Sequence, residues 1–130
     1  AKVFDFELLI SCPKGFEPDK ELLSKNNTRV SIIKDPISAV RGVDLVVTDV
    51  WASMGQESEH ERRANAFKGF QITSELMSYA NKGAVFMHCL PAHRGEEVSS
   101  DVIDAVDSIV WDEAENRMHS QKALLEFLLA

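Results

Sequence analysis

A chain of 130 residues, 45% of them hydrophobic, can form one compact domain with its own core but is too short for two. Its formal net charge is -7 and its basic residues are scattered, which argues against a partner such as nucleic acid or an anionic membrane surface. No apolar run reaches the roughly 20 residues that cross a bilayer. Cys12 and Cys89 lie far apart without metal-type spacing, so the sequence predicts neither a disulfide framework nor a metal site, and favours a reducing cytosol.

Short apolar runs rich in β-branched residues alternate with helix-like segments along most of the chain, which indicates βαβ units. Several of these runs are continuously apolar, as is typical of parallel strands that helices cover on both faces. We therefore predict an α/β fold, with an open, mostly parallel sheet of about five strands between helices on both faces, that is, a three-layer αβα sandwich. The predicted strands are residues 6–11, 29–33, 44–48, 84–90 and 108–111.

Capping and turn residues delimit the predicted helices. Asp35 and Pro36 begin a short helix that ends before Gly42. Ser99 caps a second helix, and apolar residues at helical spacing predict a terminal amphipathic helix over residues 114–129.

Polar side chains follow three of the predicted strands, in residues 49–56, 88–95 and 113–117. In open α/β sheets, ligands bind in the crevice beyond the carboxyl ends of the strands. These three segments are therefore where a site is expected, and each also has a purely structural interpretation.

The first segment begins with Asp49 at a strand end and continues through Ser53 and Gly55 in a loop. A carboxylate in that place can hold an ammonium group. Alternatively, Asp49 and Ser53 cap local structure and the glycine shapes a turn, and spacing alone favours this alternative.

The second segment places Cys89 at the end of a buried strand, where a thiol can accept or relay a proton. Adjacent strand residues point to opposite faces, so His88 and Cys89 cannot easily serve one metal or one proton. The alternative is that Cys89 is a small buried hydrophobic residue and that His88 is a core histidine bonded to backbone.

The third segment contains Arg117, whose guanidinium can clamp a phosphate or a carbonyl oxygen over the crevice. Alternatively, Arg117 forms a surface ion pair with Glu113 or Glu115, which would contribute little to stability. The remaining candidates are expected to be solvated or structural, or are assigned no role: His60, His93 and His119; Thr28 and Arg29; and Cys12.

Together, the three segments resemble those of ornithine carbamoyltransferases in residues 49–55, with Ser53, Met54 and Gly55, in His88, Cys89, Leu90 and Pro91, and in residues 113–117. Residues 13–18 and 66–71 fit the same pattern, so the resemblance spans essentially the whole chain. Aspartate carbamoyltransferases have a proline in place of Cys89, which makes aspartate the less expected acceptor. Residues 91–97 and 118–122 look more like bacterial members than animal ones.

The resemblance implies a Rossmann-like fold and a single domain over residues 1–130, the ornithine-binding half of a two-domain enzyme whose N-terminal carbamoyl-phosphate domain is absent. The implied reaction moves the carbamoyl group of carbamoyl phosphate to the δ-amine of L-ornithine. Its products are L-citrulline and phosphate, in arginine biosynthesis or the urea cycle, and no cofactor is needed. The segment alone is expected to fold around a complete sheet but to be inactive, because it lacks the helix N-terminus that binds phosphate.

The same resemblance implies roles for individual residues. Asp49 binds the amino end of ornithine together with Ser53 and the backbone of Met54. Cys89 lies beside the attacking amine as the proton acceptor, and Leu90 contacts the carbamoyl group through its backbone. Arg117 approaches the carbonyl oxygen of carbamoyl phosphate and polarises it.

Two other functions stay open on the sequence alone. One is carbamoyl transfer to another amine, such as putrescine or an acylated ornithine, and the other is a non-catalytic module that binds an amino acid. The family also implies a homotrimer or a multiple of trimers, without nucleic-acid or membrane partners. The expected location is the cytoplasm, or the mitochondrial or plastid matrix if the protein is eukaryotic.

Overall fold

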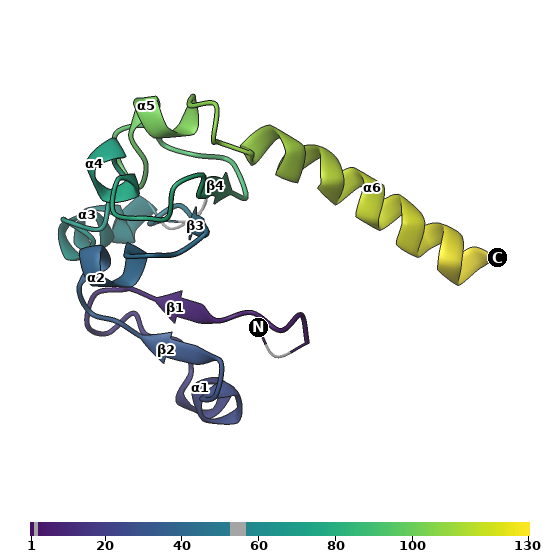
Figure 1. Cartoon of the computed structure of the whole chain (residues 1–130), viewed down its shortest axis with the longest axis horizontal. Helices are drawn as coiled ribbons and strands as arrows, with labels where there is room; N and C mark the ends of the chain where they lie inside the picture. The colour runs from purple at the N-terminus through teal and green to yellow at the C-terminus, as the bar shows by residue number, and fades with distance from the viewer. Residues whose placement is uncertain (2, 53–56) are drawn as a thin grey trace.

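The computed structural model describes residues 1, 3–52 and 57–130 of the chain. Strands and helices alternate along most of this part, as the sequence predicts (Figure 1). In chain order the elements are β1 (Leu8–Ile10), α1 (Lys20–Asn26), β2 (Val30–Ile32), α2 (Pro36–Val40), β3 (Leu45–Thr48), α3 (Glu57–Ala66), α4 (Ser74–Met77), β4 (Val85–His88), α5 (Ser100–Ile103) and α6 (Val110–Leu129).

All the strand pairs in the described residues are parallel, which confirms the α/β class. β1 pairs with β2, with Leu8 opposite Val30, and β3 pairs with β4, with Leu45 opposite Val85. The predicted single sheet is instead divided, because β1 and β3 are not hydrogen-bonded to each other in the described part of the chain.

The predicted fifth strand, residues 108–111, is wrong in its extent. Only an isolated parallel bridge joins Ser108 to Phe86, and the chain then enters α6 at Val110. Asp112 and Glu113 lie in the first turn of this helix, where negative charge interacts favourably with the positive end of the helix dipole. With these acidic residues in its first turn, the helix begins at Val110, whereas the apolar pattern predicted a start at residue 114.

Local capping explains where the shorter helices begin. The Asp35 carboxylate accepts a hydrogen bond from the Ser38 N–H at 2.8 Å, and Pro36 occupies the first turn of α2, as predicted. Gly42 follows this helix with a φ of +73°, a left-handed conformation that a glycine adopts without steric cost. α5 begins after Ser99, also as predicted.

The hydrophobic core lies on the β3–β4 half of the molecule, where Phe86, Ile103, Val98 and Val110 are almost completely inaccessible to solvent. β1 and β2 contain no fully buried residue, and neither does α1. The complete core cluster consists of Val40, Val46, Ile72, Leu76, Phe86, Val98, Val102, Ile103 and Val110.

Helix α6 extends away from the rest of the molecule, and Figure 1 shows its far end without a neighbouring element. Phe127 and Leu129 near this end are 81% and 83% exposed.

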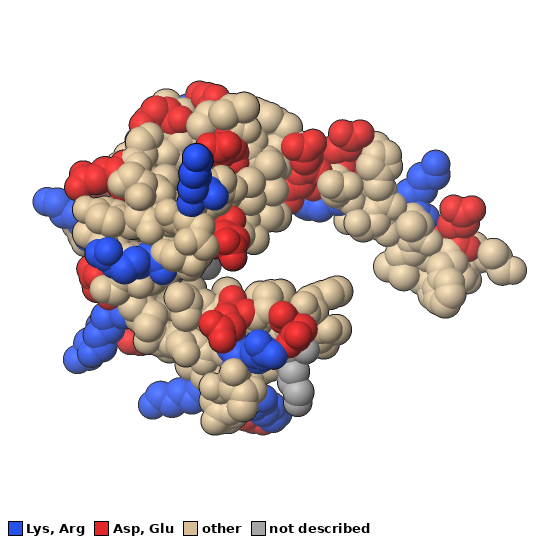
Figure 2. Space-filling model, viewed as in Figure 1, with Lys and Arg blue, Asp and Glu red and all other residues tan. Residues whose placement is uncertain are grey.

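Among the described residues, no helix is both long and apolar enough to cross a membrane. On the face drawn in Figure 2, lysines and arginines are interspersed with acidic residues rather than gathered in one patch.

Candidate functional site

The carboxyl ends of β3 and β4 bring two of the predicted site residues together. Thr48 and His88 are paired across the two strands, so the residues that follow them, Asp49 and Cys89, are neighbours. The Cys89 thiol donates a hydrogen bond to Asp49 Oδ1, with a distance of 3.2 Å between sulfur and oxygen. The same carboxylate oxygen accepts a hydrogen bond from the Val50 N–H at 2.7 Å.

Arg117 reaches this strand end from α6. Its Nη1 donates a hydrogen bond to the Cys89 carbonyl oxygen at 3.3 Å. The structural alternative was a surface ion pair of Arg117 with Glu113 or Glu115. Glu115 Oε1 instead lies 3.2 Å from His119 Nε2. The structure thus places the predicted residues Asp49, Cys89 and Arg117 in one contiguous group.

The other two predicted residues of the first segment, Ser53 and Met54, lie outside the described residues. Leu90 is described, and it has a φ of +50°, which is unusual for a residue with a branched side chain. The conformation of Leu90 therefore depends on contacts from its surroundings.

A buried pair, His88 and Glu97, supplies those contacts. Both side chains have no solvent exposure, and His88 Nε2 lies 3.2 Å from Glu97 Oε1. The Leu90 N–H donates to His88 Nδ1 at 2.9 Å, so the ring proton is on Nε2 and points to Glu97. His88 is therefore the core histidine of the structural alternative, and it holds the backbone that follows Cys89.

Glu97 is the residue that sequence reasoning missed. Its Oε1 also accepts a hydrogen bond from the His93 N–H at 2.5 Å, so one carboxylate joins the end of β4 to the following loop. Glu97 lies next to Glu96 in the sequence, and no local pattern separates the buried carboxylate from its half-exposed neighbour. The only local sign is the apolar residue Val98 that follows Glu97. In the structure Val98 is 0% exposed, so the chain turns inward here.

His93, Glu96 and Glu97 offer ligand atoms within 4.8 Å of one another, a geometry that a metal ion can use. Two of these side chains already have other partners. Glu97 Oε1 accepts the bonds described above, and Glu96 Oε2 lies 3.1 Å from His60 Nε2. These contacts give the carboxylates a structural use that requires no metal.

The electrostatic environment of Cys89 opposes its ionisation. Burial raises the pKa of the Cys89 thiol above its ordinary value, and the hydrogen bond to Asp49 and the negative charge of Asp49 raise the pKa further. Glu113 adds to this effect. In these surroundings Cys89 is therefore a thiol at neutral pH, and a nearby cation is needed to favour the thiolate, the form that can accept a proton.

We expect Asp49→Asn to lower the pKa of Cys89, because the change removes the negative charge and the carboxylate acceptor while leaving the burial unchanged. The rate of Cys89 alkylation by iodoacetamide, measured against pH, reports this directly. The midpoint of the profile should move to lower pH, with faster alkylation at neutral pH, but should stay above that of a free cysteine.

The measurement needs a Cys12→Ser background, because the pKa of the Cys12 thiol is also raised, by burial and by Glu17. An unchanged or upward-shifted midpoint in Asp49→Asn would show that the contact between Asp49 and Cys89 does not govern the thiol.

Aromatic side chains gather beside Asp49 and connect segments that are distant in sequence. The Phe67 ring lies 5.0 Å from the Phe16 ring, edge to face, and 5.9 Å from the Trp51 ring, in a stacked arrangement. Arg63 donates to the Trp51 carbonyl oxygen at 3.2 Å and lies over the Phe16 ring. Residues 13–18 and 66–71, the two further segments of the family resemblance, thus meet next to the site.

The family comparison covers nearly the whole chain. Residues 1–128 match a family described as "Aspartate/ornithine carbamoyltransferase, Asp/Orn binding domain". The chain is 56% identical to an ornithine carbamoyltransferase of Hydrogenovibrio crunogenus over 130 residues, which is 100% of this chain and 43% of the relative. It is 61% identical to that of Nitrosococcus oceani over 126 residues, 97% of this chain and 41% of the relative.

A solved structure has the same fold. The ornithine carbamoyltransferase of Burkholderia thailandensis superimposes with a TM-score of 0.86 at 48% identity, over 99% of this chain and 41% of the other. The chain therefore spans about two fifths of the length of the relatives that it matches.

Proposed function

Because the chain belongs to the family of the aspartate/ornithine carbamoyltransferase Asp/Orn binding domain, we propose that it is the ornithine-binding part of an ornithine carbamoyltransferase. That enzyme transfers the carbamoyl group of carbamoyl phosphate to the δ-amine of L-ornithine and releases L-citrulline and phosphate, a step of arginine biosynthesis. The observation that carries the proposal is the convergence of Asp49, Cys89 and Arg117 at the carboxyl ends of β3 and β4.

In this proposal the acceptor amine is bound through Asp49, whose carboxylate pairs with the α-ammonium group of ornithine. In the structure that carboxylate accepts a hydrogen bond from the Cys89 thiol. An ammonium group at Asp49 displaces the thiol and neutralises the charge that raises its pKa. Substrate binding thereby favours release of the Cys89 proton to solvent and increases the fraction of thiolate, the form that can accept a proton.

Carbamoyl transfer needs a neutral amine and a stabilised oxyanion. Cys89, as the thiolate, takes the proton of the δ-ammonium group, and the amine then attacks the carbonyl carbon of carbamoyl phosphate. A carbon–nitrogen bond forms, the bond to the phosphate oxygen breaks, and phosphate leaves with the second proton of the attacking nitrogen. Arg117 stabilises the charge on the carbonyl oxygen, and the backbone of Leu90 positions the carbamoyl group.

Ser53 and the Met54 backbone complete the proposed contacts to ornithine. Most phosphate contacts are assigned to a separate carbamoyl-phosphate domain of the same polypeptide, and closure of the two parts would exclude water. From the family resemblance we also propose assembly as a homotrimer or a multiple of trimers. We propose a cytoplasmic location because the relatives compared above are bacterial.

The test uses a polypeptide of the relatives' length, assayed for product formation from carbamoyl phosphate with ornithine, putrescine or N-acetylornithine as acceptor. We expect the highest kcat/KM with ornithine. A preference for another amine would assign a different carbamoyltransferase, and ornithine binding without turnover would indicate a binding module. The 130-residue chain assayed alone should show no turnover above background.

Asp49→Asn in the same polypeptide should raise the KM for ornithine by about tenfold or more, because a charge-assisted hydrogen bond contributes about 1.5–3 kcal/mol. The KM for carbamoyl phosphate should change little. Steady-state kinetics with each substrate varied in turn separates the two effects, and an unaltered KM for ornithine would remove Asp49 from the acceptor site.

A further inference from the structure

A tight turn after β4 gathers histidine and carboxylate side chains. The Glu96 N–H donates to the His93 carbonyl at 3.0 Å, so the side chains of these two residues leave the two ends of one turn, and Glu97 follows directly. The three residues offer ligand atoms within 4.8 Å of one another. The turn therefore places an imidazole beside two carboxylates, the mixed donor set that first-row divalent metal ions such as Zn²⁺ accept.

The backbone of this turn is held by the segment that precedes α4. Gln71 Nε2 donates to the Glu96 carbonyl at 2.7 Å, and the Ile72 N–H donates to the Glu97 carbonyl at 2.9 Å. With the backbone fixed in this way, an ion can be bound by movement of side chains alone. Such preorganisation lowers the entropic cost of binding.

One oxygen of the Glu97 carboxylate has no partner. Its Oε1 accepts hydrogen bonds from His88 Nε2 and the His93 N–H, whereas its Oε2 is buried and, among the described residues, has no hydrogen-bond partner. His88 does not balance the charge of Glu97. Its Nδ1 accepts a hydrogen bond from the Leu90 N–H, so that nitrogen carries no proton and the ring is neutral.

Both protonation states of Glu97 leave Oε2 unsatisfied. A carboxylate that is 0% exposed and lacks a cationic partner in the described part of the chain is costly. If Glu97 were protonated on Oε2 instead, the resulting O–H would be a buried donor without an acceptor in the same part of the chain. A cation bound at Oε2 removes both costs.

A second imidazole reaches the turn from α3. His60 Nε2 lies 3.1 Å from Glu96 Oε2. Zinc bonds of about 2.0–2.2 Å place tetrahedral ligands about 3.4 Å apart, so this separation is close to that of two ligands on one ion. The ligand atoms of the turn must approach one another further. The exposed ring of His93 and the partly exposed side chain of Glu96 can do so by rotation about their side-chain bonds.

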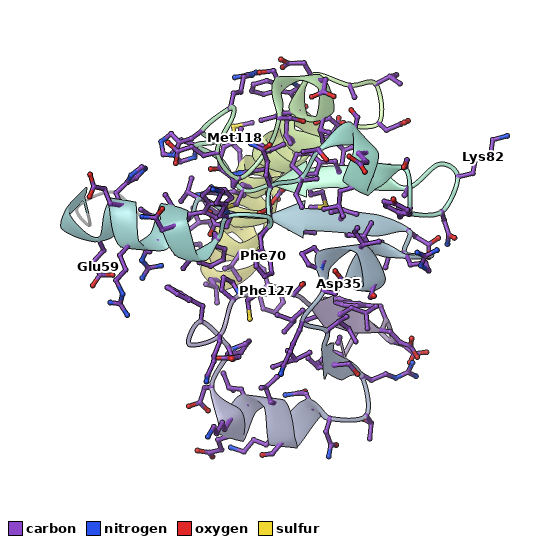
Figure 3. All side chains as sticks on the ribbon, turned by 90° about the vertical axis from the view of Figure 1, so that its left-hand side faces the viewer. Asp35, Glu59, Phe70, Lys82, Met118 and Phe127 are labelled. Atoms are coloured by element: carbon purple, nitrogen blue, oxygen red, sulfur yellow. The ribbon has the colours of Figure 1, made fainter. Side chains whose placement is uncertain are left out.

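An ion at this position would connect two parts of the molecule. Figure 3 shows α3 projecting from the body of the molecule, with the labelled Glu59 on it, and His60 is the next residue in the sequence. α3 follows β3 in the chain and the turn follows β4. The ion would therefore join the segments that continue from the two strand ends of the candidate site.

We propose that His60, His93, Glu96 and Glu97 form a binding site for one Zn²⁺ ion, with Glu97 Oε2 as the buried ligand. The hydrogen bonds at Glu97 Oε1 stay in place when the ion binds, so the carboxylate keeps its structural contacts. The ion contacts none of the residues assigned to the proposed reaction. The inference therefore does not rest on that reaction, and metal binding is measured without either substrate.

The first test is isothermal titration calorimetry with Zn²⁺ on a metal-free polypeptide of the relatives' length, in a Cys89→Ala background so that this thiol does not compete. One ion should bind with a Kd of about 1 μM or tighter. His93→Ala should weaken binding about a hundredfold or more, because even residues that only support metal ligands contribute about ten- to a hundredfold. His60→Ala should weaken it about tenfold or more.

The other variants separate metal binding from folding. His93→Ala preserves the backbone N–H that Glu97 accepts, and Glu97→Gln preserves Oε1 as an acceptor while it removes the charge. Glu97→Gln should also weaken Zn²⁺ binding about a hundredfold or more. The matched control is His119→Ala, because His119 Nε2 lies 3.2 Å from Glu115 Oε1 in an exposed pair outside the turn, and its Kd should stay within about twofold. Parental affinity in both His93→Ala and Glu97→Gln would overturn the proposal.

The second test identifies the ligand atoms with Co²⁺ as a spectroscopic probe. Bound Co²⁺ should show d–d absorption in the visible range without thiolate-to-cobalt charge transfer in the near ultraviolet, because all four proposed ligands are nitrogen or oxygen. Charge-transfer absorption would place the ion on a cysteine and overturn the assignment. A visible spectrum unaltered by His60→Ala would overturn the proposed connection between α3 and the turn.

Discussion

Cys89→Ala, in a polypeptide of the relatives' length, should lower kcat by about a hundredfold or more, the effect typical of losing a positioned general base. The KM for carbamoyl phosphate should stay within about twofold, because the Cys89 thiol contacts Asp49, the proposed ammonium partner, whereas most phosphate contacts are assigned elsewhere. Steady-state kinetics with each substrate varied separately measures both values.

Cys12→Ala is the matched control for this experiment, because Cys12 is the other free cysteine of the chain and has no assigned role. It should leave kcat within about twofold. If Cys89→Ala retained the turnover of the parent enzyme, Cys89 would not be the proton acceptor, and the contact to Asp49 would be purely structural.

Glu97→Ala should reduce the free energy of unfolding by about 3 kcal/mol, because it leaves the buried His88 Nε2–H and the His93 N–H without their acceptor. Glu97→Gln, which keeps one carbonyl oxygen, should lose only about 1 kcal/mol. Urea unfolding followed by tryptophan fluorescence or circular dichroism compares the variants.

The neighbouring Glu96→Ala serves as the control for charge, since the Glu96 side chain is 36% exposed and, within the part of the chain that the structure describes, pairs only with the half-exposed His60. Its effect should stay below about 1 kcal/mol. Equal losses for Glu96→Ala and Glu97→Ala would show that the buried pair does not hold the loop after β4.

The side chains of His88 and Cys89, which are neighbours in the sequence, point in opposite directions. Alternation along a strand correctly separated these neighbours: Cys89 contacts Asp49, while His88 turns inward to Glu97. The sequence could not tell which of Glu96 and Glu97 would meet His88. That choice depends on how the loop folds back over β4, where the packing of Val98 into the core decides it.

The prediction of one sheet of about five strands is the one that the structure changes most, because the described residues form two separate strand pairs. Apolar runs correctly located β1, β2, β3 and β4 but carry no information on which strand lies beside which. Neighbouring strands in a doubly wound sheet are often distant in sequence, so the local pattern does not give the order of the strands.

By itself, the sequence determined the α/β class, the position of four strands, the cap at Asp35, the start of α5 after Ser99, and Asp49, Cys89 and Arg117 as candidates, because these depend on local periodicity and on residue type at strand ends. The Ser99 side chain itself makes no capping hydrogen bond. Only the tertiary structure decided that Glu97 holds His88 and that β1 and β3 face each other across an open groove. Those features arise from contacts between segments far apart in the chain. No local pattern encodes such contacts, since each depends on where the rest of the fold places its partner.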